Sequence, residues 1–263
     1  MRGLDREALM GLARLAGQAI LECRAGGLDV TTKADGTPVT QADNRAGEIL
    51  TAGLAHIFPG LPVICEETAN APYEERRRYT RCFIVDPLDG TKEFAAGRED
   101  FCVCLALVED GRPVYGVIAA PVADLLYAGG PGIPSLRRES DGTEQALRVR
   151  RPGAGETIIA MASRSHPSPG LADWLARFGS VRTISRGSAL KFCALAQGDC
   201  HVYPRLGPTS EWDVAAGHAL VLGAGGVMTA LDGSPFTYNK PEFINGPFLA
   251  HSLDPADPRL ARP

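Results

Sequence analysis

Apolar residues recur at three- and four-residue spacing between Asp5 and Arg24, the pattern of an amphipathic helix with one buried face. A second helix is expected to begin after Thr40, a suitable N-cap, and to run toward Pro59. Asp43 then lies in the first turn of this helix, near the positive end of the helix dipole. The chain is therefore predicted to open with two helices.

Beyond residue 60 the apolar stretches become short and β-rich, and Gly, Pro and Asp separate them. Glu109, Asp110 and Gly111 form a good hairpin turn between two of these stretches. The pattern predicts four strands in this region, at residues 62–65, 82–85, 101–108 and 114–119.

The pattern changes again after residue 130. Segment 131–155 is rich in Gly, Pro, Ser and Arg, which is typical of a join between two halves of a chain. Beyond it, a strand at 158–162 alternates with helices at 171–178 and 189–196, which favours a layered α/β arrangement. We therefore expect a mixed α/β (α+β) chain that forms one structural unit, with an N-terminal α+β half at 1–130 and a C-terminal α/β half at 131–263.

One segment resembles a membrane span, because residues 214–231 carry no formal charge. Its glycine cluster would break a helix near the middle, so we predict a buried helix, a glycine turn and a strand. The N-terminus lacks the uninterrupted apolar stretch of a secretory signal. A cytoplasmic location without a transmembrane segment is expected, and peripheral contact with the inner membrane stays open.

Composition and charge narrow the class of partner. The 263 residues are 44% hydrophobic and 22% charged, as in ordinary globular proteins, and the formal net charge is -4. This acidic balance argues against a nucleic-acid polymer as partner. The seven cysteines form no CxxC pair, which suits reduced, buried thiols better than disulfides or zinc sites.

The segment Asp86–Thr91, with the sequence DPLDGT, carries the strongest chemical signal. Two carboxylates three residues apart follow an apolar strand, and they repel each other unless a cation lies between them. Oxygen ligands suit a hard cation, magnesium first. Gly90 and Thr91 follow at a loop-to-helix junction, where free N–H groups can hold a phosphate. In isolation, a calcium-stabilised turn or a plain type I turn explains this segment equally well.

Two further acidic sites favour the metal interpretation. Glu66 and Glu67 end another short apolar strand, and Asp213 stands at the start of the apolar segment 214–231. Taken singly, each is more often a helix cap or a surface acid, but together they supply the oxygens that two or three magnesium ions need. Asp43 at its helix start could orient the Thr91 hydroxyl, and that hydroxyl could orient an attacking water.

With these residues, the chain resembles the inositol-monophosphatase superfamily of lithium-sensitive, magnesium-dependent phosphatases, from the first helix to about Phe248. The matching motifs are Glu-Glu after a strand, Asp-Pro-Leu-Asp-Gly-Thr, and a distal Trp-Asp followed by Ala-Ala-Gly. The resemblance implies a layered α-β-α-β-α sugar-phosphatase fold with its site between the two halves. It implies metal ligands at Glu66, Asp86, the Leu88 carbonyl, Asp89 and Asp213, a water-activating pair at Asp43 and Thr91 assisted by Glu66, and phosphate contacts at Gly90, Thr91 and Asp213.

Within this superfamily the sequence is most similar to the bacterial 3'(2'),5'-bisphosphate nucleotidases. That similarity implies removal of the 3'-phosphate from adenosine 3',5'-bisphosphate, and of its sulfated form as a further substrate. Arg205 stands near the position where inositol enzymes are expected to use a glutamate, and an arginine fork can pair with a second phosphate. Lys191 could serve the same phosphate. A simple surface arginine and a solvent-facing lysine are the alternatives for these two residues.

Other functions are weighed against this one. An inositol or sugar monophosphatase would use the same metal site. A non-catalytic metal-binding regulatory protein is disfavoured because Asp43 and Thr91 are both present, and a P-loop or Rossmann module is disfavoured because neither glycine motif occurs. Glu67 could contact a third, weaker metal or only shape its loop, and Cys65 is not expected to affect catalysis. The oligomeric state is not readable from the sequence.

Three histidines are a further candidate metal set. Their spacing fits no zinc pattern, so we interpret them as structural or exposed residues. They are His166, His201 and His218.

Overall fold

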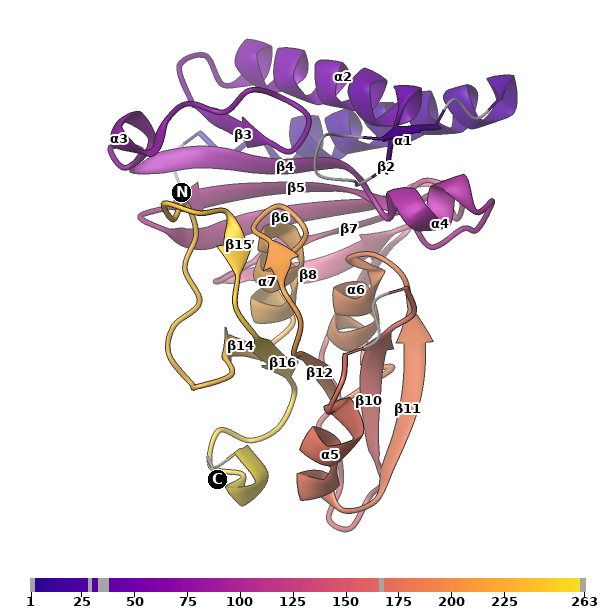
Figure 1. Cartoon of the computed structure of the whole chain (residues 1–263), viewed down its shortest axis with the longest axis vertical. Helices are drawn as coiled ribbons and strands as arrows, with labels where there is room; N and C mark the ends of the chain where they lie inside the picture. The colour runs from indigo at the N-terminus through magenta and orange to yellow at the C-terminus, as the bar shows by residue number, and fades with distance from the viewer. Residues whose placement is uncertain (1–2, 28–29, 33–37, 166–167, 261–263) are drawn as a thin grey trace.

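The computed structural model describes residues 3–27, 30–32, 38–165 and 168–260. Helices and sheets alternate from one end of the molecule to the other (Figure 1). Helices α1 (Arg6–Gly26) and α2 (Gln41–Ile57) cover one face of a large sheet, and α6 (Leu190–Ala196) and α7 (Ala215–Gly223) cover the other. A second sheet follows, with α5 (Leu171–Leu175) on its outer face. This α-β-α-β-α order confirms the predicted fold.

The large sheet has seven strands in sequence order. Its first two strands are parallel, and every later pair is antiparallel. Both faces are buried, so its central strands are almost continuously apolar. The strands are β3 (Val63–Cys65), β4 (Arg81–Asp89), β5 (Cys102–Glu109), β6 (Arg112–Ala120), β7 (Leu125–Gly130), β8 (Ile133–Arg138) and β9 (Glu144–Ala146).

The second sheet has five strands, in the order β11-β10-β12-β16-β14. A two-stranded pair, β13 with β15, lies beside α7 near the large sheet (Figure 1), and β1 pairs with β2 next to α2. The bounds are β1 (Val30–Thr32), β2 (Pro38–Thr40), β10 (Ile158–Ser163), β11 (Val181–Arg186), β12 (Val202–Arg205), β13 (Thr209–Ser210), β14 (Val227–Ala230), β15 (Ile244–Asn245) and β16 (Phe248–His251). The remaining helical elements are α3 (Tyr73–Arg76), α4 (Thr91–Ala95), η1 (Ala176–Phe178) and η2 (Pro258–Leu260).

The first two helices begin where the sequence predicts. Asp5 caps α1 by accepting a hydrogen bond from the Ala8 amide at 3.0 Å. Thr40 caps α2 in a reciprocal capping box with Asp43, which satisfies amides that the first helical turn leaves open. This cap holds the Asp43 carboxylate at the end of α2.

The segment 131–155 differs from the expected join. It contains β8 and β9, which extend the large sheet by two antiparallel strands, so the expected boundary between residues 130 and 131 falls at the end of β7, inside this sheet. The sequence IPSLRR of β8 alternates poorly because the strand is only partly covered, and its arginines bind acidic side chains at the surface. The large sheet therefore ends at Ala146.

Two glycines let the middle helices approach their neighbours closely. A Cβ atom at Gly116 on β6 would lie 2.3 Å from the carbonyl oxygen of Ala216 on α7. A Cβ atom at Gly217 would lie 2.2 Å from the ring of Phe192 on α6. Any other residue at either position would push α7 away from the sheet and from α6, and α7 follows directly after Asp213.

The segment 214–231 forms α7, a glycine turn and β14, as predicted. Within the described part of the chain, we find no helix that is both long enough and apolar enough to cross a bilayer.

Candidate active site

Asp86 and Asp89 reach the same side of the large sheet because β4 bulges between them. Asp86 pairs opposite Cys104 and Asp89 opposite Cys102, so a three-residue step on β4 matches a two-residue step on β5. Residues two apart on a strand share a face, and both cysteines face α6 and α7. The bulge therefore brings both carboxylates to the side where the second half packs.

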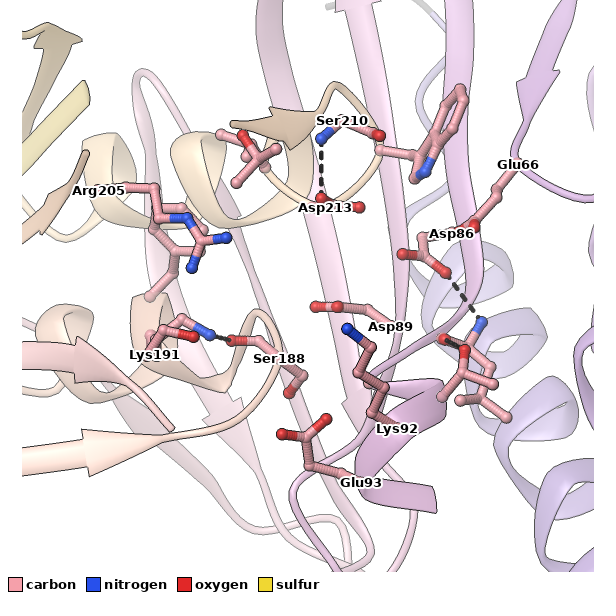
Figure 2. Close-up of a pocket in the computed structure, with 18 of the residues that line it drawn as sticks. Glu66, Asp86, Asp89, Lys92, Glu93, Ser188, Lys191, Arg205, Ser210 and Asp213 are labelled. Carbon is pink, nitrogen blue, oxygen red and sulfur yellow. Dashed lines mark hydrogen bonds between the residues drawn. The ribbon is translucent and has the colours of Figure 1, made fainter. Parts of the chain in front are cut away.

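Two more acidic residues join this pair. Glu66 follows β3, and Asp213 precedes α7. Carboxylate oxygens of Glu66, Asp86 and Asp213 all lie within 4.8 Å of one another. We call Glu66, Asp86, Asp89 and Asp213 the acidic wall; Figure 2 shows its side chains converging from both halves of the chain.

Burial makes this arrangement costly without a cation. Removal from water, together with the neighbouring carboxylates, raises the pKa of Asp213 to about 8 and the pKa of Asp86 well above its usual range. Burial also raises the pKa of Asp89, to about 6, although the Lys191 ammonium and the Ala189 amide act in the opposite direction. An oxygen-only set of this kind is suited to a hard divalent cation such as magnesium.

Asp43 and Thr91 meet behind the acidic wall. The Thr91 hydroxyl lies 3.1 Å from Asp43 Oδ1 and 3.2 Å from the Leu88 carbonyl oxygen, and its single proton can go to one of them at a time. Asp43 Oδ2 accepts from the amide and the hydroxyl of Thr40 at 2.7 and 2.6 Å. Burial raises the pKa of the Asp43 carboxyl above its ordinary value. The structure thus brings the predicted pair together.

Asp213 is held by hydrogen bonds on both sides of the turn that contains it. The Ser210 amide donates to Asp213 Oδ2 at 2.8 Å. Two residues earlier, the fully buried Glu211 forms an ion pair with Lys240 at 2.5 Å and accepts from the amides of Asn239 and Lys240. The sequence pattern did not reveal this role of Glu211, because its partners lie almost thirty residues away.

Basic side chains occupy the opposite side of the same pocket (Figure 2). Lys191 on α6 is 6% exposed and Arg205 on β12 is 8% exposed, so neither is the surface cation that the alternative interpretation required. The Lys191 ammonium donates to the Ser188 carbonyl, and burial lowers its pKa. Arg205 Nη2 donates to the Pro208 carbonyl at 3.2 Å, whereas the buried Nε has no hydrogen-bond partner among the described residues. We call Lys191 and Arg205 the basic wall.

The two walls enclose a cavity of about 350 Å³ at the boundary of the two halves. Gly90 and Thr91, which the resemblance implies as phosphate contacts, line this cavity where α4 begins. The sequence suggested no role for six further residues that line the cavity: Lys92, Glu93, Ser163, Ser188, Tyr203 and Trp212. All six lie in short stretches that resemble the family, and that is the signal that could have marked them.

Two other residues named from the sequence, Cys65 and Glu67, lie away from the cavity. Cys65 is fully buried on the α2 side of the sheet, and burial raises the pKa of its thiol to about 11. Glu67 does not line the cavity; its Cβ lies on the same side of the sheet as Cys65, near Gly47 of α2. These positions agree with no catalytic role for Cys65 and with a structural role for Glu67.

Two of the three candidate histidines are described, and both are buried structural residues. Nδ1 of His201 accepts from the Ile159 amide at 3.0 Å, and burial lowers its pKa. His218 is buried against Tyr238, with its ring nitrogen 2.9 Å from the phenol oxygen, and burial lowers its pKa to about 3. His166 lies outside the described residues.

Comparison with known proteins identifies the family. The family model described as the inositol monophosphatase family matches residues 5–258. The chain belongs to the inositol monophosphatase family. This confirms the resemblance drawn from the motifs and accounts for a layered fold with its acidic cluster between two sheets.

Curated relatives within this family include bacterial nucleotidases. The 3'(2'),5'-bisphosphate nucleotidase CysQ of Escherichia coli K12 is 40% identical over 240 residues, which cover 90% of this chain and 95% of the relative. The enzyme of the same name from Buchnera aphidicola is 37% identical over 247 residues, covering 92% and 91% of the two chains.

Solved structures agree with this placement. CysQ from Bacteroides thetaiotaomicron, described as a bacterial member of the inositol monophosphatase family, superposes with a TM-score of 0.79 at 35% identity and covers 94% of this chain and 96% of its own. An inositol monophosphatase from Zymomonas mobilis superposes with a TM-score of 0.76 at 27% identity, covering 97% and 95%.

Proposed function

We propose that the chain is a magnesium-dependent 3'(2'),5'-bisphosphate nucleotidase, which hydrolyses the 3'-phosphate of adenosine 3',5'-bisphosphate to give AMP and phosphate. The observation that carries this proposal is the pairing of the acidic wall with the basic wall across one cavity. A substrate with two phosphates can place the reacting phosphate at the acidic wall and the second phosphate at the basic wall. The curated relatives of the same name support the same substrate class.

The acidic wall fits magnesium in its donor set. Glu66, Asp86, Asp89 and Asp213, with the Leu88 carbonyl oxygen, would hold two or three ions by oxygen ligands alone, as Mg²⁺ prefers. When bound, magnesium neutralises the carboxylates, polarises the phosphoryl oxygens and lowers the pKa of a water molecule.

Asp43 and Thr91 would then handle the proton of the attacking water. If the Thr91 hydroxyl donates to Asp43 Oδ1, its lone pairs remain free to accept from that water. The proton released as the water oxygen bonds to phosphorus can pass by way of Thr91 to Asp43, whose pKa is raised by burial. The bond between phosphorus and the 3' oxygen breaks, and this oxygen takes up a proton from solvent water and leaves as the ribose hydroxyl.

The basic wall would bind the phosphate that does not react. Arg205 can offer a guanidinium fork, and its buried Nε still lacks a partner among the described residues. Lys191 adds a second positive charge beside it, which would be less costly to bury when an anion is bound. A sugar monophosphate supplies no anion for these two cations.

Phosphate release tests the proposal. Adenosine 3',5'-bisphosphate and inositol 1-phosphate are compared with magnesium, with magnesium plus lithium, and with EDTA. We expect strong preference for the bisphosphate, abolished by EDTA. Preference for inositol 1-phosphate would instead support a monophosphatase, the function in the name of the Zymomonas mobilis structure. Turnover of neither substrate would contradict both and favour a non-catalytic metal-binding protein.

A further inference from the structure

Two buried thiols stand directly beside the acidic wall and take no part in the proposed reaction. Cys102 and Cys104 lie two residues apart on β5 and share the face that looks toward α6 and α7. Their Sγ atoms are 3.8 Å apart. Cys102 Sγ also lies 3.9 Å from Asp89 Oδ2 and 3.5 Å from Ser188 Oγ.

This spacing is that of ligands around a small tetrahedral cation. With zinc–sulfur bonds of about 2.3 Å, two thiolates on one tetrahedral zinc ion lie about 3.8 Å apart. With a zinc–oxygen bond of about 2.1 Å, a thiolate and an oxygen ligand lie about 3.6 Å apart. The observed distances from Cys102 to Cys104, Asp89 and Ser188 match these values within about 0.3 Å.

We propose that Asp89, Cys102 and Cys104 form a second cation site, selective for thiophilic divalent ions such as Zn²⁺, and that its occupation inhibits the enzyme. One carboxylate and two thiolates give three protein ligands that lie within 4.8 Å of one another. The Ser188 hydroxyl or a water completes four-coordination. Zinc would displace the two thiol protons on binding, since thiolates are its ligands.

Selectivity between the two sites follows from their donors. The acidic wall offers oxygen only, which suits magnesium, whereas soft sulfur ligands select zinc or cadmium over magnesium. Asp89 belongs to both sets. A thiophilic ion bound by the cysteines therefore takes a carboxylate from the magnesium site, and magnesium does not compete for the sulfur ligands in return.

The ion can reach this site from the substrate cavity. Both thiols are almost completely buried, but Asp89 and Ser188 line the cavity and stand between it and Cys102. Ser188 has a left-handed backbone conformation, with φ of 51°. Metal binding itself does not depend on the proposed function, but the inhibition does, because it acts by way of Asp89.

Cadmium titration of the full chain in excess magnesium tests binding without an activity readout. Cadmium thiolates absorb in the ultraviolet by charge transfer, so we expect absorption that saturates at one equivalent in the native protein. Cys102→Ala and Cys104→Ala should weaken this binding at least about tenfold. Cys200→Ala, which removes a buried thiol outside the set, is the matched control and should bind as the native chain does. Cys102→Ser and Cys104→Ser preserve side-chain volume if an alanine variant fails to fold.

Inhibition by zinc completes the test. With each variant compared with its own zinc-free rate, the zinc concentration for half inhibition should rise at least about tenfold in the Cys102 and Cys104 variants and stay unchanged in Cys200→Ala. Equal inhibition of all variants, or no thiolate absorption with cadmium, would overturn the second site and leave the nucleotidase intact. If the native protein bound one equivalent of cadmium but showed no phosphatase activity, the proposed function would be overturned and the second cation site would stand.

Discussion

The acidic and basic walls face each other across one cavity, but they are built differently. Most of the acidic wall comes from strand ends of the large sheet, and hydrogen bonds from Ser210, Ala189 and Leu88 fix its carboxylates. The basic wall comes from α6 and β12 of the second half, and the buried Nε of Arg205 is left without a partner among the described residues. A preformed wall suits chemistry that is common to a family, whereas a wall with unused donors suits the choice of substrate.

The largest effect on activity is expected from a change at Asp43, the partner of Thr91. Asp43→Asn keeps the shape of the side chain but removes the proton acceptor of Thr91, so kcat should fall by about 10²–10⁴ with little change in KM. Steady-state kinetics with adenosine 3',5'-bisphosphate measures this. Asp5→Asn is the control, because Asp5 also caps a helix but lies outside the cavity. Equal losses in both variants would mean that the effect comes from capping.

Substitutions in the basic wall should mainly change the KM for the bisphosphate. Arg205→Glu replaces a cation by an anion next to the second phosphate, so KM for the bisphosphate should rise about 10–100-fold, the loss of a charged hydrogen bond. Turnover of 3'-AMP, which lacks that phosphate, should change much less. Arg205→Lys retains the positive charge without the guanidinium fork, so its KM for the bisphosphate should lie between that of the native chain and that of Arg205→Glu. Equal loss for both substrates would place Arg205 in the chemistry instead of in substrate choice.

Glu211 links protein stability to the position of Asp213. Glu211→Gln weakens a buried ion pair with Lys240 and should lower the free energy of unfolding by about 1–3 kcal/mol. It should also raise the magnesium concentration needed for half-maximal activity. Urea unfolding and magnesium titration measure the two effects, with Glu242→Gln, an exposed glutamate in the same region, as control. Lower stability with unchanged magnesium dependence would separate Glu211 from the site.

The smallest effect is a pH dependence of magnesium stabilisation. The pKa of Asp213 in the folded, metal-free chain is about 8, above its ordinary value of 3.8, so its proton favours the folded state at low pH. Metal-free stability from this group is lost as pH rises through 8, and magnesium, which competes with the proton, should stabilise more at pH 8.5 than at pH 6.

Thermal unfolding with and without magnesium at several pH values checks this prediction. Each 1 kcal/mol of added stability should raise the Tm by about 2–4 °C. The buried histidines and Lys191, whose pKa values are also shifted, contribute to stability both with and without magnesium. Their contributions therefore cancel when the two unfolding temperatures are subtracted. Asp213→Asn should reduce the pH dependence, and the part that remains belongs to Asp86 and Asp89, whose pKa values are also raised. An unchanged pH dependence in that variant would assign it entirely to those other carboxyl groups.

The acidic wall was readable from sequence because its residues stand near strand ends or before a helix, within short motifs. Asp86 and Asp89 lie three residues apart, and a capping pattern marked Asp43. The basic wall was predicted only as a pair of candidates, since the burial of Lys191 and Arg205 depends on how the second sheet packs. The sequence shows that both residues are positively charged, but it does not show whether their side chains are buried or exposed.

Other features depend on contacts that no local pattern contains. The role of Glu211 requires Lys240, and the 3.8 Å spacing of Cys102 and Cys104 requires the pleat of β5. Strand β8 escaped detection because its alternation is weak and its outer residues are charged. By contrast, the hairpin turn at Asp110 and Gly111, both with positive φ, was visible because this geometry favours such residues.

The bulge between Asp86 and Asp89 has a consequence for insertions and deletions at this point of the chain. Removing one residue between the two aspartates would restore regular pairing with β5 and leave the carboxylates two residues apart, still on one face. Adding one residue, or removing both, would turn Asp89 toward α1 and α2 and away from the cavity. We therefore expect an insertion at this point to separate the two carboxylates onto opposite faces, whereas a one-residue deletion keeps both on the face toward the cavity.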